Sequence, residues 1–172
     1  MSTLKVNTIQ EADGTAFNFV QAQQWRQTTN TSNPTSLTSN WEVNDNTAYG
    51  SLGLAMSESS GVFTFPSTGI YYIAVDQTFH VTSNRKDRRC EIHIQTTTDN
   101  SSYSDIAIGY TNLAGESSTT FGTASCATFV DITDTANRKV QFTASVNTSQ
   151  TQLTGNSGYN ENSYVFIRLG DT

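Results

Sequence analysis

Hydrophobic and polar residues alternate along much of the chain, most clearly between Gly61 and Val81. The stretch reads as a short strand, a turn over Pro66 to Gly69, and a long strand. In the long strand, one side carries Tyr71, Ile73, Val75, Phe79 and Val81, with Gln77 as its one polar break. The other side carries Tyr72, Ala74, Asp76, Thr78 and His80. A period of two residues is typical of a strand with one buried face, so this stretch predicts a building block of a β-sandwich.

The same alternation recurs toward both ends of the chain, and no apolar stripe with the helical period of 3.6 residues is visible. The glycines in Tyr49–Met56 favour an irregular loop there. About eight to ten strands are expected, separated by polar turns, which is the pattern of an antiparallel sandwich or jelly roll. The further predicted strands are Gln23–Thr31, a short piece at Trp41 and Val43, Arg89–Thr97, Tyr103–Tyr110, Thr119–Ile132, Arg138–Val146 and Tyr164–Leu169.

The first residues form a separate segment in this interpretation. Leu4, Val6 and Ile9 predict a weak strand, Asp13-Gly14 is a strong turn signal, and a second strand carries Phe17 and Phe19. We therefore expect a short arm or hairpin over residues 1–22 and a jelly-roll domain over residues 23–172. A chain of 172 residues is long enough for one well-buried domain and short for two.

Composition supports an all-β protein and narrows its partners. Ser, Thr and Asn make up roughly a third of the chain, which suits strand surfaces and tight turns. The formal net charge of −6 argues against a general nucleic-acid binder, because neutralising phosphates needs clustered Lys and Arg. The chain also lacks the apolar run of a membrane span or of a secretory signal, so no membrane insertion is expected.

The sequence contains none of the common catalytic or cofactor motifs. It has no nucleophile elbow, no zinc-protease motif, no phosphate loop and no dinucleotide fingerprint, so we expect neither an enzyme nor a cofactor. Both histidines, His80 and His93, are interpreted as surface or interface residues. Carboxylate pairs such as Asp131 with Asp134, or Asp99 with Asp105, lack the Gly-spaced ligands of a calcium loop, and no metal is expected.

The two cysteines, Cys90 and Cys126, fit neither a zinc site nor a redox motif. They are either two reduced thiols or a single disulfide between neighbouring strands, and the sequence leaves both alternatives open.

One short segment concentrates the positive charge. Arg85, Lys86, Arg88 and Arg89 surround Asp87 and supply four of the nine basic residues. The segment lies between two predicted strands, so it should form a loop or hairpin end. It is either a solvated turn that protects strand edges or a contact for an acidic surface, such as a neighbouring capsid subunit or an anionic cell-surface glycan.

Three segments together resemble a known fold family. GVFTFPSTGIYYIAV, TASCATFVDITDTANRKVQFTASV and the terminal NSYVFIRL are similar to the globular jelly-roll domain of the C1q and tumour-necrosis-factor superfamily. The resemblance covers Gln23 to Leu169. It departs from the family at the late turn, which reads Asp134-Thr135-Ala136-Asn137 where a Gly-Asp is usual.

The resemblance implies a homotrimer in which three sandwiches pack through an apolar face around a threefold axis. Aromatic residues exceed the needs of one core, as such an assembly would require. The candidates for the trimer interface are Tyr71, Tyr72, Phe121, Tyr164 and Phe166, with Phe65 and Phe129 adding to the aromatic excess.

The opening STLKVNTIQEADGTAFNF is similar to the N-termini of structural proteins of marine tailed phages, especially cyanophages. This implies a virion component whose arm attaches it to the capsid surface or to tail proteins. The arm residues expected to bind the partner are Leu4, Val6, Ile9, Phe17 and Phe19. An alternative role for the arm is to staple the protein's own sandwich.

Two functions follow as expectations. In the first, the protein is a trimeric capsid decoration or cement protein on the virion surface. In the second, the same trimer belongs to a tail fibre or projection and recognises a host surface glycan or protein. The first is preferred because no shaft or repeat is visible in the chain.

Overall fold

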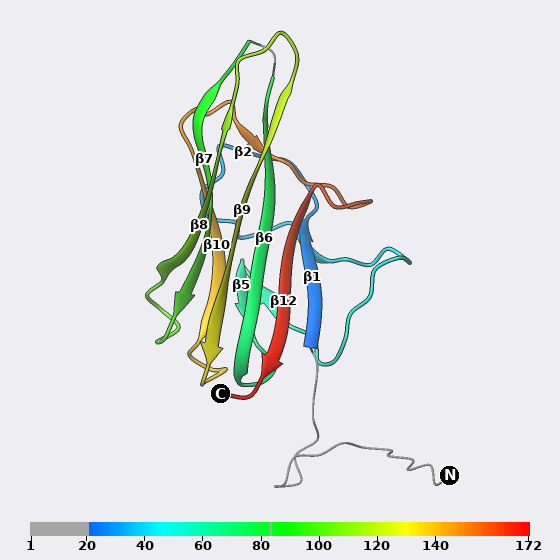
Figure 1. The fold of residues 1–172 in the computed structure, drawn as a ribbon, viewed down its shortest axis with the longest axis vertical. Helices are drawn as coiled ribbons and strands as arrows, with labels where there is room; N and C mark the ends of the chain where they lie inside the picture. The colour runs from blue at the N-terminus through cyan, green and yellow to red at the C-terminus, as the bar shows by residue number, and fades with distance from the viewer. Residues whose placement is uncertain (1–20, 83) are drawn as a thin grey trace, which may run out of the picture.

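The computed structural model describes residues 21–82 and 84–172. The residues expected to form the attachment arm, Leu4, Val6, Ile9, Phe17 and Phe19, lie outside this part of the chain. Every regular element of the described residues is a β-strand, and all strand pairs are antiparallel, as predicted. The strands form two sheets that pack face to face (Figure 1).

The first sheet has the order β2-β11-β6-β12-β1-β3. β11 and β12 share one edge of β6, and β9 pairs with the opposite edge. Its strands are β1 (Gln21–Gln27), β2 (Thr31–Ser32), β3 (Trp41–Val43), β6 (Gly69–Val81), β9 (Thr120–Ile132), β11 (Gln152–Leu153) and β12 (Asn162–Gly170). The second sheet has the order β4-β5-β10-β7-β8. Its strands are β4 (Ser57–Ser59), β5 (Val62–Thr64), β7 (Asp87–Thr97), β8 (Ser104–Leu113) and β10 (Lys139–Val146). The chain crosses repeatedly from one sheet to the other, as in a jelly roll.

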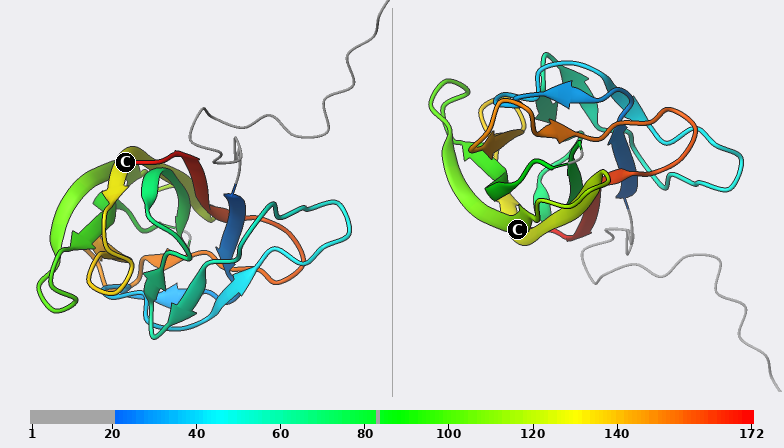
Figure 2. Two further views of the ribbon diagram at one scale, coloured as in Figure 1. Left: turned by 90° about the horizontal axis from the view of Figure 1, so that it is seen from below. Right: turned by 90° about the horizontal axis from the view of Figure 1, so that it is seen from above.

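β6 is the central strand of the first sheet. It pairs with β9 along its full length, from Gly69 opposite Ile132 to Val81 opposite Thr120. Its other edge pairs with β12 and then with β11. Seen along the long axis, the two sheets surround the core (Figure 2).

The core follows the predicted alternation. The predicted inner side of β6 is buried, and Gln77, its polar break, accepts a hydrogen bond from the Tyr164 hydroxyl at 2.6 Å. Trp41 packs against Phe63 and Tyr164 with ring centroids 4.9 and 4.6 Å apart, in the edge-to-face geometry that aromatic pairs favour. Residues from both sheets meet in this cluster, which therefore joins the two layers.

The described residues form twelve strands where eight to ten were expected, and the three-residue β4 was not predicted. β1 begins at Gln21, which pairs with Arg168 of β12, so Gln21 and Ala22 belong to the sandwich and not to the arm. The two-residue strands β2 and β11 were not predicted, because their pairing depends on contacts between distant segments. Tyr49–Met56 contains no strand, as expected, and touches β1 through a bridge between Leu52 and Ala22.

Candidate functional site

The outer face of the first sheet exposes aromatic rings. Phe121 and Phe129 project from β9 with 61% and 65% of their surface exposed. Each ring lies against a ring of β6: Phe129 against Tyr72, and Phe121 against His80, both with centroids 5.5 Å apart. Between them, the hydroxyls of Thr78 and Thr123 hydrogen-bond at 2.9 Å. We call these residues of β6 and β9 the aromatic face.

The structure divides the predicted trimer-interface residues into two groups. Tyr72 and Phe121 belong to the aromatic face, where a partner could reach them. Tyr71, Tyr164 and Phe166 are fully buried in the core, so their assignment to an interface is wrong. The physical reason is the strand period: neighbouring residues such as Tyr71 and Tyr72 point to opposite faces, and only one of the two faces is open.

Burial also shifts the pKa values of Tyr164, on the buried side of the first sheet, and of His80, on its outer side. Burial raises the pKa of Tyr164 well above its ordinary value. Burial lowers the pKa of His80, and the nearby Glu161 carboxylate only partly opposes this. His80 is therefore mostly neutral at pH 7, and the aromatic face carries little positive charge at that position.

The basic segment was expected to be a loop or hairpin end, but it spans the end of the connection from β6 to β7, with Arg85 and Lys86, and the start of β7, with Arg88 and Arg89. Arg85, Lys86, Arg88 and Arg89 are all exposed. Arg88 and Arg89, with Asn147 from the turn after β10, line a shallow hollow. The structure thus brings together residues from two distant parts of the chain at one end of the sandwich.

Asp87, within the basic run, is buried beneath this hollow and does not face solvent. Its carboxylate accepts hydrogen bonds from the backbone N–H groups of Arg89, Asn147 and Thr148 at 3.0–3.2 Å, and from the Thr151 hydroxyl at 2.6 Å. Burial raises the pKa of this carboxyl, and the hydrogen bonds outweigh that effect, so that its pKa lies below the ordinary value. Asp87 is therefore an ionised structural group.

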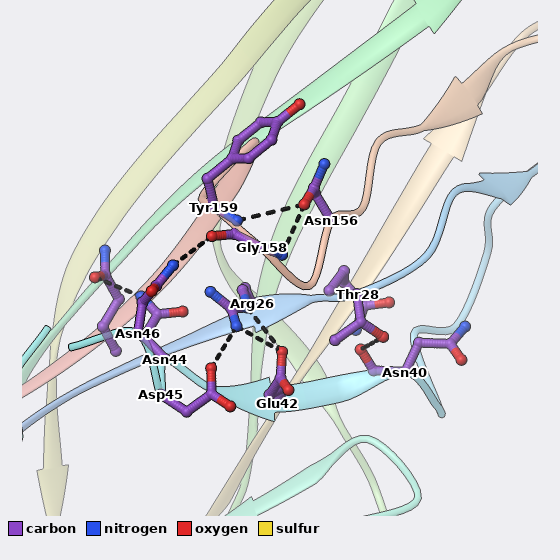
Figure 3. Close-up of polar contacts among 12 residues, drawn as sticks. Arg26, Thr28, Asn40, Glu42, Asn44, Asp45, Asn46, Asn156, Gly158 and Tyr159 are labelled. Carbon is purple, nitrogen blue, oxygen red and sulfur yellow. Dashed lines mark hydrogen bonds and ion pairs between the residues drawn. The ribbon is translucent and has the colours of Figure 1, made fainter. Parts of the chain in front are cut away.

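A second polar cluster surrounds Arg26 at the edge of the first sheet formed by β1 and β3 (Figure 3). The Arg26 side chain is fully buried and pairs with Glu42 at 2.8 Å and with Asp45 at 2.7 Å. Its Nη1 atom has no hydrogen-bond partner among the described residues. The sequence analysis missed this site, because a single arginine in an alternating strand normally points to solvent.

Amide groups extend this cluster to the loop before β12. Asn44 donates to the Gln24 side chain at 2.7 Å, and Asn46 donates to the carbonyl of Gly158. Asn156 accepts from the N–H groups of Gly158 and Tyr159, as Figure 3 shows. These bonds hold together two loops, and the Tyr159 ring remains exposed beside them.

The histidines do not form a catalytic constellation with a nucleophile in the described residues. Asp76 accepts a hydrogen bond from Ser125 rather than from His80. On the outer face of the second sheet, His93 lies between Glu91, 3.6 Å from its Nε2, and Asp105, 3.2 Å from its Nδ1. No hydroxyl or thiol from residues 21–82 or 84–172 hydrogen-bonds to His93, so the imidazole contacts two carboxylates and no nucleophile.

Two of the carboxylates considered as cation ligands, Asp99 and Asp134, accept hydrogen bonds within their own turns. Asp99 accepts hydrogen bonds from Thr97, Ser101 and Ser102, and Asp134 accepts from the turn at Ala136 and Asn137. Where the structure describes the chain, no three His, Cys, Asp or Glu side chains gather as a metal site.

Both cysteines are free thiols, which decides between the two alternatives left open by the sequence. Burial raises the pKa of Cys90 to about 12 and that of Cys126 to about 11.

No protein-family model and no curated protein matches this chain. Solved structures do match. Murine APRIL at pH 5.0 superimposes with a TM-score of 0.61 at 11% identity, over 87% of this chain and 99% of that one. The Eiger TNF from S. frugiperda gives the same TM-score at 10% identity, over 89% of this chain and 94% of that one. The chain has a TNF-like jelly-roll fold.

This TNF-like fold confirms the fold class expected from the three resembling segments. At such low identity the likeness concerns the fold alone, and function depends on the surfaces that this chain adds to it. Across the described residues there is also no helix of the length and apolar character needed to cross a membrane. The candidate functional surfaces of the described residues are the aromatic face and the hollow at Arg88 and Arg89.

Proposed function

We propose that this protein is a non-enzymatic structural component of a phage particle. It assembles as a homotrimer through the aromatic face, and residues 1–20 attach the trimer to the virion surface. The most favoured role is decoration or cementing of the capsid.

The observation that supports assembly is the exposure of Phe121 and Phe129 on β9, which pairs with β6 along its full length. Large apolar side chains that gather on one open sheet face mark an interaction surface. Their rings already pack against Tyr72 and His80, so little side-chain freedom remains to be lost on binding. The face is therefore prepared for a rigid partner of matching shape.

A second copy of the same chain is the partner that the fold favours. The resemblance to the C1q and tumour-necrosis-factor superfamily implies a threefold assembly through an apolar face. A stable contact needs roughly 1,200–2,000 Å² of buried surface with an apolar centre. The aromatic face supplies such an apolar centre, and polar side chains of β6 and β9, such as Thr78 and Thr123, lie around it.

The oligomeric state tests the assembly. We expect light scattering coupled to size-exclusion chromatography to give a trimer at micromolar concentration. Phe121→Ser with Phe129→Ser should give a folded monomer. The matched control is Tyr159→Ser, which removes an equally exposed ring from a loop outside the aromatic face and should leave the trimer intact. A monomeric wild-type protein would contradict the assembly.

The virion part rests on the similarity of the first residues to phage structural proteins. We expect deletion of residues 1–20 to leave a folded trimer that no longer attaches to particles. Gln21 and Ala22 must be kept, since they pair with β12. Loss of folding in this truncated protein would instead assign the segment to the protein's own core.

Copy number distinguishes the capsid role from a projection. Quantitative mass spectrometry of purified particles should give hundreds of copies relative to the major shell protein. A few trimers per particle would place the protein at a tail or vertex and favour host recognition. Absence from purified particles would overturn the virion proposal.

A further inference from the structure

The basic residues gather at one end of a protein that is acidic as a whole. The net charge is −6, yet four of the nine basic residues fall within Arg85–Arg89. Figure 1 places the connection between β6 and β7 at the end of the sandwich opposite to the start of β1. The positive charge is thus local, and it lies far from the point where residue 21 enters the fold.

A β-bulge sets the direction of the two arginines. Asp87 pairs with Leu113 and Cys90 pairs with Thr111, so Arg88 and Arg89 together stand opposite the single residue Asn112. In a regular strand two neighbours point to opposite faces, and one of them would point inward. The extra residue of a bulge re-aims side chains, and here both arginines reach solvent.

Asp87 holds both walls of the hollow in place. One of its oxygens accepts from the backbone N–H groups of both Arg89 and Asn147, 3.1 and 3.2 Å away. The other oxygen of the carboxylate accepts hydrogen bonds from Thr148 and Thr151 beneath the surface. The hollow is therefore preorganised, and Asp87 does not cover the guanidinium groups.

Few carboxylates compete for the basic side chains. Arg89 Nε lies 3.4 Å from Glu91, a single contact that leaves the terminal nitrogens of the guanidinium without an ion pair. Among the described residues no carboxylate lies within ion-pair distance of Arg85, Lys86 or Arg88. An arginine fork without a partner is suited to a carboxylate, sulfate or phosphate group with several acceptor oxygens.

We propose that Arg88, Arg89 and Asn147 form a binding site for the anionic groups of an acidic polysaccharide. Arg88 and Arg89 pair with sulfate or carboxylate oxygens, and the Asn147 amide hydrogen-bonds to the sugar. Arg85 and Lys86 extend the positive surface along the chain of the ligand.

The surroundings favour a polysaccharide over an acidic protein. Specific protein interfaces have an apolar centre. None of the large exposed apolar side chains lies in residues 84–89 or 147–150, and on the neighbouring strand β8 the exposed side chain opposite Glu91 is Tyr110, whose ring carries a hydroxyl. A polyanionic sugar chain needs charged and hydrogen-bonding groups and little apolar area.

The existence of this site does not depend on the proposed function. Only the expectation that the site faces a host surface rests on it. If the segment before Gln21 attaches the protein to a particle, the opposite end carries the hollow outward, toward a host surface. A trimer would also present three such sites in parallel, so that binding to a long chain gains avidity.

The test is a binding measurement on the purified full-length protein with immobilised dextran sulfate. Polygalacturonate tests carboxylate groups, neutral dextran is the uncharged control, and poly-glutamate tests an acidic polypeptide. We expect binding to both acidic polysaccharides, weakened by added salt because the contacts are exposed ion pairs. Arg88→Ser and Arg89→Ser should each weaken binding about tenfold.

Matched variants separate a built site from general charge. Arg138→Ser removes the same charge from the turn before β10 and should leave affinity unchanged. Arg88→Lys keeps the charge and should still weaken binding, because the fork is lost. Circular dichroism and thermal unfolding verify that the exposed substitutions leave the fold intact.

Each outcome decides the proposal. Equal losses for Arg138→Ser and Arg88→Ser, no wild-type binding, or preference for poly-glutamate would each overturn it. Specific loss at Arg88 and Arg89 would support it even if the protein were absent from particles, so its failure and that of the virion proposal are distinguishable.

Discussion

Gly109 of β8 approaches the backbone of Ser125 in β9 so closely that a Cβ atom at position 109 would lie 2.4 Å from the Ser125 carbonyl oxygen. The two strands belong to different sheets, and this approach closes one side of the sandwich. Glycine is needed here for space and not for an unusual backbone angle.

Gly109→Ala should therefore destabilise the protein by about 2 kcal/mol or more, because neither backbone can move aside without disturbing its own sheet. Urea unfolding measures the loss. Gly50→Ala is the control, since a Cβ atom there meets nothing within 4 Å, and it should change the free energy of unfolding by less than about 0.5 kcal/mol. Equal stabilities of the two variants would disprove the tight contact.

Asp87 makes the stability dependent on pH in the acid range. Its pKa in the folded protein lies below the unfolded value, so its contribution is complete above the unfolded pKa of about 4 and is lost as the pH falls through the folded pKa. Asp87→Asn should cost about 2 kcal/mol at pH 7, because charge-assisted hydrogen bonds are replaced. The difference in unfolding free energy between Asp87→Asn and the wild type should narrow as the pH falls below about 4. A difference in unfolding free energy that stays constant from pH 7 to the acid limit would contradict this role.

In the Arg26 cluster, we expect loss of Glu42 to lower the free energy of unfolding more than loss of Arg26 itself. Glu42→Ala leaves a buried guanidinium with less compensation and should destabilise the protein by about 2–3 kcal/mol. Arg26→Met removes the buried charge, including the unpaired Nη1 group, while keeping an unbranched side chain, and should cost less than about 1 kcal/mol. Denaturant unfolding of the two variants tests this order, and a larger loss for Arg26→Met would reverse the interpretation.

The two thiols should react slowly while the protein is folded. Burial raises the pKa of Cys90 to about 12 and that of Cys126 to about 11, so little thiolate is present at pH 8. Iodoacetamide should label neither cysteine rapidly in native buffer and both after denaturation without a reductant. A denatured protein that takes up no label would indicate a disulfide.

Residue alternation was sufficient to predict the long strands, because each of them has one face in the core. Cys90, Ile92 and Ile94 of β7 illustrate this, as all three are fully buried as expected. Alternation cannot say whether a loop covers the opposite face. For this reason it missed Arg26, whose outward side chain lies under the loop carrying Asp45.

The candidate sites were only partly predictable for a related reason. The basic run was visible in the sequence, but the bulge that directs Arg88 and Arg89, and the approach of Asn147, depend on pairing between distant strands. The alternation places Tyr71 and Tyr72 on opposite sides of the strand, yet both were assigned to the interface, because the excess of aromatic residues was counted regardless of side. The side of the strand decides which of the two can reach a partner, and only Tyr72 lies on the open face.

The position of β12 between β1 and β6 constrains the order in which the protein can fold during synthesis. β1 is made long before β12, which apart from the short β3 is the strand that pairs with it. Until residues 162–170 emerge, β1 and one edge of β6 expose unpaired backbone groups to other chains. Stop codons that remove β12 should therefore yield aggregates rather than a smaller soluble sandwich, because both strands that β12 joins are then left with an open edge.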